Sequence, residues 1–372
     1  MYRLGVLEGD GIGPEIVPAA VAIADAALAA SGVSRVQWVS LPLGASAIES
    51  HGAATPEETL SALAELDGWL LGPHDSASYP EPHRSQLNPS GTIRKRFDLF
   101  ANIRPAKGFE GTRALAPNTD LVIVRENSEG FYADRNTYAG SGEYMPSADV
   151  AVAMGIVTRA GVERIARVAL DLARRRRGRL TIVHKANVLK LTMGLFLDVC
   201  RELAGDYPDV TLDDFHVDAM TVHLVRHSPD FDVIVTENMI GDILSDLAGE
   251  IAGSLGLAPS LNASNDAAMA QAAHGSAPDI AGRNLANPIA MALSTAMLLE
   301  WLGLRHDDEP ARAAATAIER GVTGAVRAGV STRDLGGTAS TSEFTRAVVD
   351  VIIASPGTGS GPRRSSRRPS RR

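Results

Sequence analysis

Short apolar runs with the length of β-strands alternate with long alanine-rich segments along this chain. The strand-like runs lie at residues 3–9, 36–44, 68–73, 120–127, 179–187 and 231–238. Apolar side chains at helical spacing fill residues 15–32, 161–178 and 287–303. Strands that alternate with helices of this length predict an α/β fold with a substantial parallel sheet.

The chain of 372 residues is long enough for two domains, and no linker interrupts residues 1–354, so two domains would be closely joined. It has no run of 18 or more uncharged apolar residues, and it starts on a strand pattern, which indicates neither a membrane span nor export. The single cysteine, Cys200, lies in a helical pattern and is expected to be a buried core thiol. A reducing cytoplasm fits these features.

The formal net charge of −8 conceals a basic end, because residues 363–372 contain six arginines and no acid. We expect residues 355–372 to form a disordered, Arg-rich tail. Binding of nucleic acid by this tail is an alternative, but a solvated extension without a catalytic role is the simpler interpretation. A second basic run, Arg174–Arg177, closes a helical pattern, where cations suit the helix dipole, so nucleic acid is not an expected partner.

Three glycines, Gly9, Gly11 and Gly13, follow the first strand-like run and precede Pro14. Their spacing is G-x-G-x-G, not the G-x-G-x-x-G of a dinucleotide-binding Rossmann turn, and no acid is well placed to hold a ribose. The glycines predict a tight turn, and the proline suits the first turn of a helix.

Asp242 and Asp246 are four residues apart after the run at 231–238, which places both carboxylates on one helix face. A helix cap or first-turn acid also explains Asp242. It does not explain Asp246, which lies among apolar residues, where an unpaired charge is costly. With Asp218 as a candidate third ligand, these carboxylates suit Mg²⁺ or Mn²⁺, which prefer oxygen ligands.

His223 and His227 are also four residues apart on a predicted helix, which resembles half of a zinc site. Leu224 stands where the zinc-protease motif needs a glutamate, and the sequence shows no third ligand. We therefore expect surface or otherwise satisfied histidines here, and no zinc.

Four arginines, Arg94, Arg96, Arg104 and Arg125, occur in two neighbouring motifs. The planar guanidinium group of arginine suits carboxylates. Arg125 follows a strand at its C-terminal end, where open α/β sheets place their ligands. From the residues alone, convergence on one anion and ordinary solvation both stay open.

Together these motifs carry a family resemblance. They read, in chain order, GDGIGPEI, RKRFDLFANIRP, VRENSEGFY, HKANVL, GDILSD, HGSAPDIAG and DLGGTASTSEF. This series resembles the metal-dependent β-decarboxylating dehydrogenases, which include the isocitrate, 3-isopropylmalate, homoisocitrate and tartrate/D-malate dehydrogenases. The resemblance runs from residue 3 to about residue 353.

The resemblance implies two intertwined α/β domains of the isopropylmalate/isocitrate dehydrogenase type, not a Rossmann fold. Residues 1–99 and 254–354 would form a discontinuous cofactor-side domain, and residues 100–253 a central domain with the dimer interface. The active site would be shared, so a homodimer is expected.

The resemblance also places the cofactor on one loop. The implied cofactor-binding residues are His274, Gly275, Ser276, Ala277, Asp279 and Asn287. The pair Asp279–Ile280 is similar to that of the NAD-using members. A carboxylate accepts hydrogen bonds from ribose hydroxyls and repels a 2′-phosphate, so NAD is expected rather than NADP.

Carried over by position, the resemblance implies roles for eight residues of the active site. Arg94, Arg104 and Arg125 would hold the substrate's carboxylates, and Asp242 and Asp246 would hold Mg²⁺ or Mn²⁺ together with the partner subunit's Asp218. Lys185 would be the catalytic base, reaching across the dimer interface, and Tyr132 the catalytic acid. Because all of these are present, a non-catalytic regulatory subunit is the weaker alternative.

The substrate is less closely defined. Isopropylmalate members have a leucine pair where this chain has Ser90 and Gly91, whereas isocitrate members have a polar pair similar to Asn88 and Ser90. We therefore expect a small hydroxy-dicarboxylate or tricarboxylate with a polar substituent, bound in part by Asn88 and Ser90. A tartrate/D-malate activity is the alternative, as is a larger group admitted by Gly91. Leu87 replaces a glutamate of the isopropylmalate members, and residues 133–147 match no branch.

Overall fold

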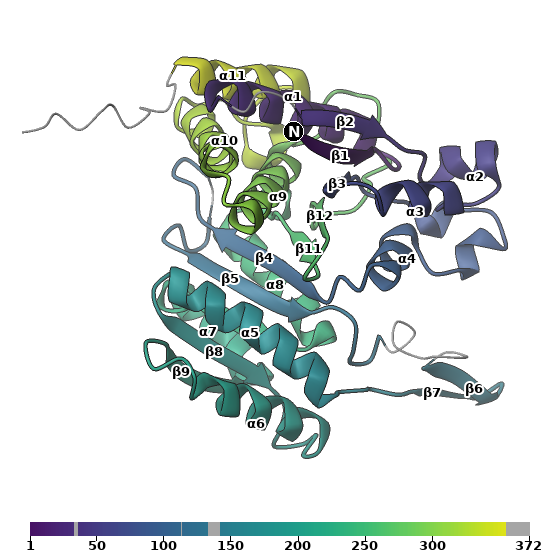
Figure 1. The fold of residues 1–372 in the computed structure, drawn as a ribbon, viewed down its shortest axis with the longest axis vertical. Coiled ribbons are helices and arrows are strands. Elements are labelled where there is room, and N and C mark those ends of the chain that lie inside the picture. The colour runs from purple at the N-terminus through teal and green to yellow at the C-terminus, as the bar shows by residue number, and fades with distance from the viewer. Residues whose placement is uncertain (33–35, 113, 133–141, 355–372) are drawn as a thin grey trace, which may run out of the picture.

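The protein is described by a computed structural model for residues 1–32, 36–112, 114–132 and 142–354. Within these residues one large mixed sheet runs through the molecule, from β2 to β9 (Figure 1). Its strands are β1 (Tyr2–Leu7), β2 (Val36–Ser40), β3 (Gly68–Leu71), β4 (Ala101–Lys107), β5 (Asp120–Glu126), β8 (Arg179–His184), β9 (Thr211–His216), β10 (Val233–Thr236), β11 (Leu261–Ala263) and β12 (Ala268–Gln271). A separate hairpin joins β6 (Glu143–Ser147) to β7 (Val150–Ala153).

The strand order is β2-β1-β3-β12-β11-β4-β5-β10-β8-β9, so the sheet has two halves that meet where β11 pairs with β4. Most pairs within each half are parallel, as predicted. The pairs of β11 with β12, β11 with β4 and β4 with β5 are antiparallel. The α/β prediction is confirmed, and the antiparallel centre is a feature that the sequence pattern did not indicate.

Helices cover the sheet, and each segment that the sequence pattern predicts to be helical forms a helix. They are α1 (Gly13–Ala30), α2 (Ala45–His51), α3 (Glu57–Leu63), α4 (Pro89–Arg96), α5 (Arg159–Arg175), α6 (Thr192–Ala204), α7 (Val217–His227), α8 (Asn238–Ala252), α9 (Ile289–His306), α10 (Glu309–Arg327) and α11 (Thr341–Ala354). Single 3₁₀ turns occur at Ser76–Ser78, His83–Ser85, Ser228–Asp230, Leu255–Leu257 and Arg333–Leu335.

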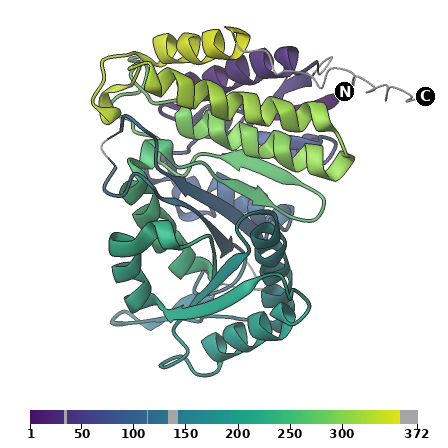
Figure 2. The same ribbon diagram turned by 90° about the vertical axis from the view of Figure 1, so that its left-hand side faces the viewer.

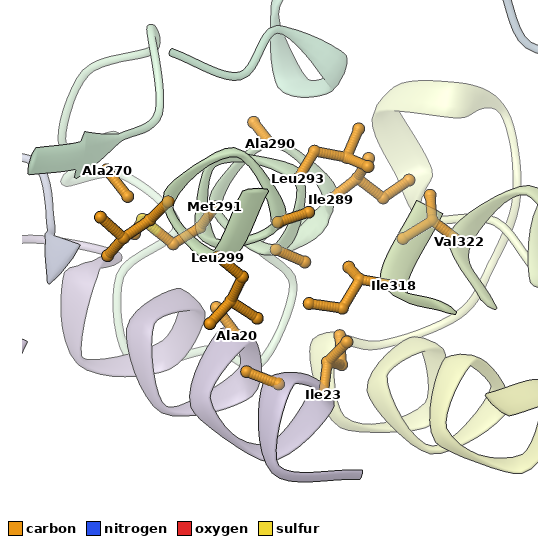
Figure 3. Packing of buried hydrophobic residues seen from close by; sticks show 14 of the residues in the cluster. Ala20, Ile23, Ala270, Ile289, Ala290, Met291, Leu293, Leu299, Ile318 and Val322 are labelled. Atoms are coloured by element: carbon orange, nitrogen blue, oxygen red, sulfur yellow. The ribbon is translucent and has the colours of Figure 1, made fainter. Parts of the chain in front are cut away.

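One hydrophobic core forms around α9, which packs against α1 and α10 (Figure 3). Residues from both ends of the chain contribute to it, since Ile23 of α1 and Ile318 of α10 share it with Leu299 of α9. Figure 2 shows α1 beside α9, α10 and α11 at one end of the molecule. α1 is long and apolar enough to cross a membrane by length and composition, but its buried side chains belong to this core.

A second core is built from residues 100–252, between β5, β8, β10 and the helices α5, α6 and α8. Cys200 belongs to it and is fully buried, as predicted, and burial raises the pKa of its thiol. The two cores draw on the segments that the resemblance assigns to two domains, but the exact domain boundaries stay a prediction. The Arg-rich tail, 355–372, and most of the unmatched stretch 133–147 lie outside the described residues.

The opening glycine turn connects the start of the chain to a loop near its end. Gly11 has φ +58°, and the next amide, of Ile12, donates a hydrogen bond to the carbonyl of Ser276 at 2.9 Å. A Cβ atom on Gly11 would lie 2.0 Å from that same carbonyl oxygen. The turn therefore needs glycine both for its left-handed backbone and for this close approach.

We predict that Gly11→Ala lowers the free energy of unfolding by about 2 kcal/mol or more, because left-handed strain of roughly 1 kcal/mol adds to a backbone overlap. Gly52→Ala is the matched control, since Gly52 has φ +72° but a Cβ atom there would meet no other atom within 4 Å. Urea unfolding of both variants measures the difference. Equal losses in the two variants would contradict the contact with Ser276.

Candidate active site

Helix α8 presents Asp242 and Asp246 on one face, as their spacing predicted. Glu237 caps this helix, and its carboxylate accepts hydrogen bonds from the amides of Met239 and Ile240. The alternative that Asp242 is the cap or a first-turn acid is therefore wrong. The expectation that apolar neighbours bury Asp246 is also wrong, because its side chain is 54% exposed and Ile243 beside it is exposed.

Two buried arginines on neighbouring strands face these carboxylates. Nη1 of Arg104, on β4, lies 3.3 Å from Oδ1 of Asp242 and 3.3 Å from Oδ1 of Asp246. Arg125, on β5, donates to Asp242, while its Nε and Nη2 atoms donate to Oδ1 of Asn238 at 3.0 and 2.6 Å. The structure thus brings together Arg104, Arg125 and both acids.

Tyr132 joins the same cluster. Its hydroxyl donates to Oδ2 of Asp242 at 3.3 Å, and the guanidinium of Arg125 lies 5.8 Å from the centre of its ring. Gly241 makes room for this arrangement, because a Cβ atom there would be 2.6 Å from Cγ of Arg125. Tyr132, the predicted catalytic acid, therefore lies beside Arg125, a predicted substrate ligand, and Asp242, a predicted metal ligand.

The chemistry of this cluster fits a divalent cation. The pKa of Asp246 is raised: partial burial and the charge of Asp242 raise it, whereas Arg104 and Arg125 act in the opposite direction. Two adjacent carboxylates that are balanced by guanidinium groups form an oxygen donor set that suits Mg²⁺ or Mn²⁺. In the described part of one chain, no three His, Cys, Asp or Glu side chains gather into a complete site.

Lys185 and Asp218 form a pair of their own. Lys185 follows β8, Asp218 lies in the first turn of α7, and Nζ is 2.5 Å from Oδ1. Lys185 holds the pKa of Asp218 below its usual range. The predicted base and the predicted third metal ligand thus stand together, with the side chain of Asp218 largely exposed.

The polar residues around α4 form a third group. Asn88 caps this helix by accepting from the amide of Gly91 at 2.8 Å, and Arg94 donates to Oε1 of Gln271 at 3.0 Å. Ser90 is only 5% exposed and is hydrogen-bonded to Asn88 and His74. Ser90 is therefore placed behind the surface, whereas Asn88 and Arg94 remain partly accessible.

A cavity of about 490 Å³ lies beside the predicted cofactor loop. Four predicted residues line it: His274, Gly275, Ala277 and Asn287. Asp279 is exposed on the same loop without lining it, and the carbonyl of Ser276 is engaged by the opening turn. His274 donates from Nδ1 to the carbonyl of Gly275, which leaves its buried Nε2 as an acceptor without a partner among the described residues.

Several residues of these groups were missed from the sequence. Asn238 orients Arg125, and Ser245 accepts a hydrogen bond from Arg104 at 2.8 Å. Asn238 ends the strand-like run at 231–238, and Ser245 lies between the two aspartates, so their position beside the predicted ligands was the available signal. The buried Glu126 had the same signal, since it follows Arg125, whereas His74 had none.

Comparison with known proteins agrees with this geometry. The sequence profile described as isocitrate/isopropylmalate dehydrogenase matches residues 3–348. The chain belongs to this family. It is 43% identical to an isocitrate/homoisocitrate dehydrogenase of Thermus thermophilus, over 94% of this chain and 98% of that protein. It is 39% identical to a 3-isopropylmalate dehydrogenase of Archaeoglobus fulgidus, over 95% of this chain and 100% of that protein.

Solved structures support the same family. A crystal structure of isocitrate dehydrogenase from Methylococcus capsulatus matches with a TM-score of 0.84 and 41% identity, covering 95% of this chain and 99% of that one. The recognition of the family from its motifs is confirmed, and so is its fold. Because the family's relatives are dehydrogenases, the protein is an oxidoreductase.

Glu126, next to Arg125, gives a prediction for pH dependence. Burial raises the pKa of its carboxyl to about 7, although Ser128 and Glu129 donate hydrogen bonds to it. The folded state then holds a proton that the unfolded state releases at lower pH. The protonated carboxyl of Glu126 therefore stabilises the folded state fully below about pH 4.5. This contribution to the free energy of unfolding, on the order of 3 kcal/mol, is lost as the pH rises through about 7.

We expect Glu126→Gln to remove this loss, because the amide keeps an acceptor for the backbone amides and carries no charge. The difference in free energy of unfolding between variant and parent should therefore shift in favour of the variant from pH 5 to pH 8, as measured by urea titration. A parallel pH dependence of the two proteins would show that Glu126 does not titrate as described.

Proposed function

We propose that this protein is an NAD-dependent, divalent-metal-dependent β-decarboxylating dehydrogenase. Its substrate would be a 3-substituted (2R)-malate of the isocitrate, homoisocitrate or 3-isopropylmalate type, converted to a 2-oxo acid, CO₂ and NADH. The observation that carries the proposal is the convergence of Arg104, Arg125 and Tyr132 on the carboxylates of Asp242 and Asp246. Such a cluster can hold carboxylates, a cation and a proton donor at one place.

Residues of this chain would bind the substrate and transfer its protons. The guanidinium groups of Arg94, Arg104 and Arg125 bind and orient the substrate's carboxylates. Lys185 removes the proton from the C2 hydroxyl while hydride leaves C2. After CO₂ has left C3, Tyr132 donates a proton to that carbon.

Two bound groups would complete the chemistry. Mg²⁺ or Mn²⁺, held by Asp242, Asp246 and the partner subunit's Asp218, would supply positive charge at the C2 oxygen and the C1 carboxylate. NAD, held in the cavity beside His274, would accept the hydride. The acceptor Nε2 of His274 fits an amino group such as that of adenine, and the nearby carboxylate of Asp279 fits NAD better than NADP.

A homodimer is part of the proposal, because one chain provides two separate half-sites: Asp242 with Asp246, and Lys185 with Asp218. Large apolar side chains are exposed on α7, α8 and the segment after β8. They are Val188, Leu191, Val222, Val225 and Ile243. Exposed apolar side chains of this size favour a contact surface, and in the proposed dimer a second copy covering them would bring the half-sites together. We place the enzyme in the cytoplasm.

The test of the function is a substrate panel. Isocitrate, homoisocitrate, 3-isopropylmalate, D-malate and tartrate are each supplied with NAD and Mn²⁺, and NADH absorbance is followed. We expect turnover with a substrate that has a polar C3 substituent. Preference for D-malate or tartrate would support the alternative activity, and no turnover with any of them would contradict the substrate class.

On the best substrate, Lys185→Gln and Tyr132→Phe should each lower kcat by roughly 10²- to 10⁴-fold, because each removes a proton-transfer group. Lys190→Gln is the matched control, since Lys190 is exposed on the same segment. Steady-state kinetics measures the effect. A kcat for Lys185→Gln that matches the Lys190→Gln value would remove Lys185 from the reaction.

Mixing two inactive variants tests the shared site. Lys185→Gln and Asp246→Asn chains, unfolded together and refolded, should regain activity at about a quarter of the sites, because half of the dimers are mixed and each mixed dimer has one intact site. Each variant refolded alone is the control. Failure to regain activity, with dimers shown by sedimentation, would place Lys185 and Asp246 in the same chain's site.

A further inference from the structure

His74 is hydrogen-bonded to a residue of the proposed substrate pocket, although no motif singled it out. It follows β3, and its Nε2 atom lies 3.0 Å from Oγ of Ser90. Oγ of Ser90 lies in turn 3.0 Å from Oδ1 of Asn88. Since Ser90 is buried, this short chain of contacts is largely shielded from water.

The positions of the protons in this series of hydrogen bonds follow from its end at Asn88. The backbone amide of Gly91 donates to Asn88 at 2.8 Å, so the accepting atom is the side-chain oxygen and not the amide nitrogen. The hydroxyl of Ser90 then donates to the same oxygen. Its own oxygen is left to accept from His74, which must carry a proton on Nε2.

The other ring nitrogen of His74 agrees with this tautomer. Nδ1 is buried and has no partner within the described residues, so a proton there would be a buried donor without an acceptor. The pKa of His74 is lowered to about 4, chiefly by burial and also by the charge of Arg94, against the opposite effect of Asp10 and Asp75. His74 is therefore neutral near pH 7.

The opening turn fixes the segment that carries His74. The carboxylate of Asp10 accepts from the amide of Asp75 at 2.9 Å and from the hydroxyl of Tyr79 at 2.5 Å. It also accepts from the amide of Ala45 at 2.8 Å. The bond from Asp75 holds the backbone next to His74, and the bonds from Tyr79 and Ala45 hold the carboxylate of Asp10 in place.

This network determines what α4 offers to a ligand. Oδ1 of Asn88 already accepts two hydrogen bonds, which orients its amide so that the nitrogen is the group left to donate. The guanidinium of Arg94, on the same helix, is also a donor. Two donors presented by one helix favour a substituent that ends in an acceptor, such as a carboxylate.

We propose that His74 is a positioning residue for substrate selection: by keeping the hydroxyl of Ser90 on Oδ1 of Asn88 it secures, together with the amide of Gly91, the orientation of the Asn88 amide, so that the pocket selects substrates with a hydrogen-bond acceptor on the C3 substituent. This inference rests on the proposed function, because it places that substituent beside Asn88. It assigns His74 no contact with the reacting atoms.

Two variants of His74 and two substrates test the proposal. His74→Leu removes the donor, whereas His74→Gln keeps an N–H that can reach Ser90. We expect His74→Leu to raise KM for isocitrate or homoisocitrate by about tenfold, the effect of roughly one strong hydrogen bond. Its kcat, and its KM for D-malate, which has no C3 substituent, should stay near the parent values, and His74→Gln should restore the lower KM.

A uniform change for both substrates, or failure of His74→Gln to rescue, would overturn the positioning role. Measurement of KM over pH 5–8 adds a further check, since a neutral His74 predicts no step near pH 6.5 that depends on residue 74.

A ligand-free measurement separates this inference from the proposed function. The ¹⁵N shifts of the imidazole, assigned by comparison with His74→Gln, should show the Nε2-protonated neutral form from pH 5 to pH 8. A protonated ring or the Nδ1 tautomer would overturn the inference whatever the enzyme's activity. If the Nε2-protonated form is found but no substrate of the panel reacts, the proposed function fails and the hydrogen-bond network stands.

Discussion

Two guanidinium groups buried on adjacent strands require negative charge beside them, and α8 provides it. Arg104 and Arg125 are 8% and 2% exposed, so without a partner each would be a costly buried charge. Asp242 contacts both arginines, and Asp246 contacts Arg104. The orientation of α8 against β4 and β5 therefore follows from the balance of charge as much as from apolar packing.

Under the proposed function, the same balance of charge would link the binding of a cation to the binding of the substrate. A cation at Asp242 and Asp246 would take the place of the arginines as their positive partner. Carboxylates of a substrate would then take the place of the aspartates beside Arg104 and Arg125. Binding of the cation alone would leave the arginines without negative partners, and binding of the substrate alone would leave the aspartates without positive ones. Binding of both would keep every charge paired, so each should favour the other.

The strong periodic segments of the fold were predictable from sequence. The run at 120–127 became β5, and the segment at 287–303 became α9, because long apolar patterns determine their own structure. β11 has only three residues and β4 contains Pro105, so neither shows a strand pattern, and pairing across the centre of the sheet sets their direction. Their antiparallel register depends on contacts distant in sequence, which no local pattern contains.

For the site, spacing placed Asp242 and Asp246 on one helix face but gave the wrong environment for Asp246. Apolar neighbours in the sequence suggested burial, yet Ile243 is exposed in a single chain, so apolar character did not report which side faces the core. His74 could not be found in advance, because Ser90 is sixteen residues away across irregular backbone. Family motifs supplied the roles that spacing left open.

The junction of β11 with β4 has a mechanical consequence. The chain passes between the two cores near residues 100 and 253, and at the junction Asn262 pairs with Asn102 in the sheet. If the cores separated, both strands would become unprotected edges with unpaired backbone groups, which attract other chains. We therefore expect the two cores to unfold as one cooperative unit, and a partly opened molecule to be prone to aggregation.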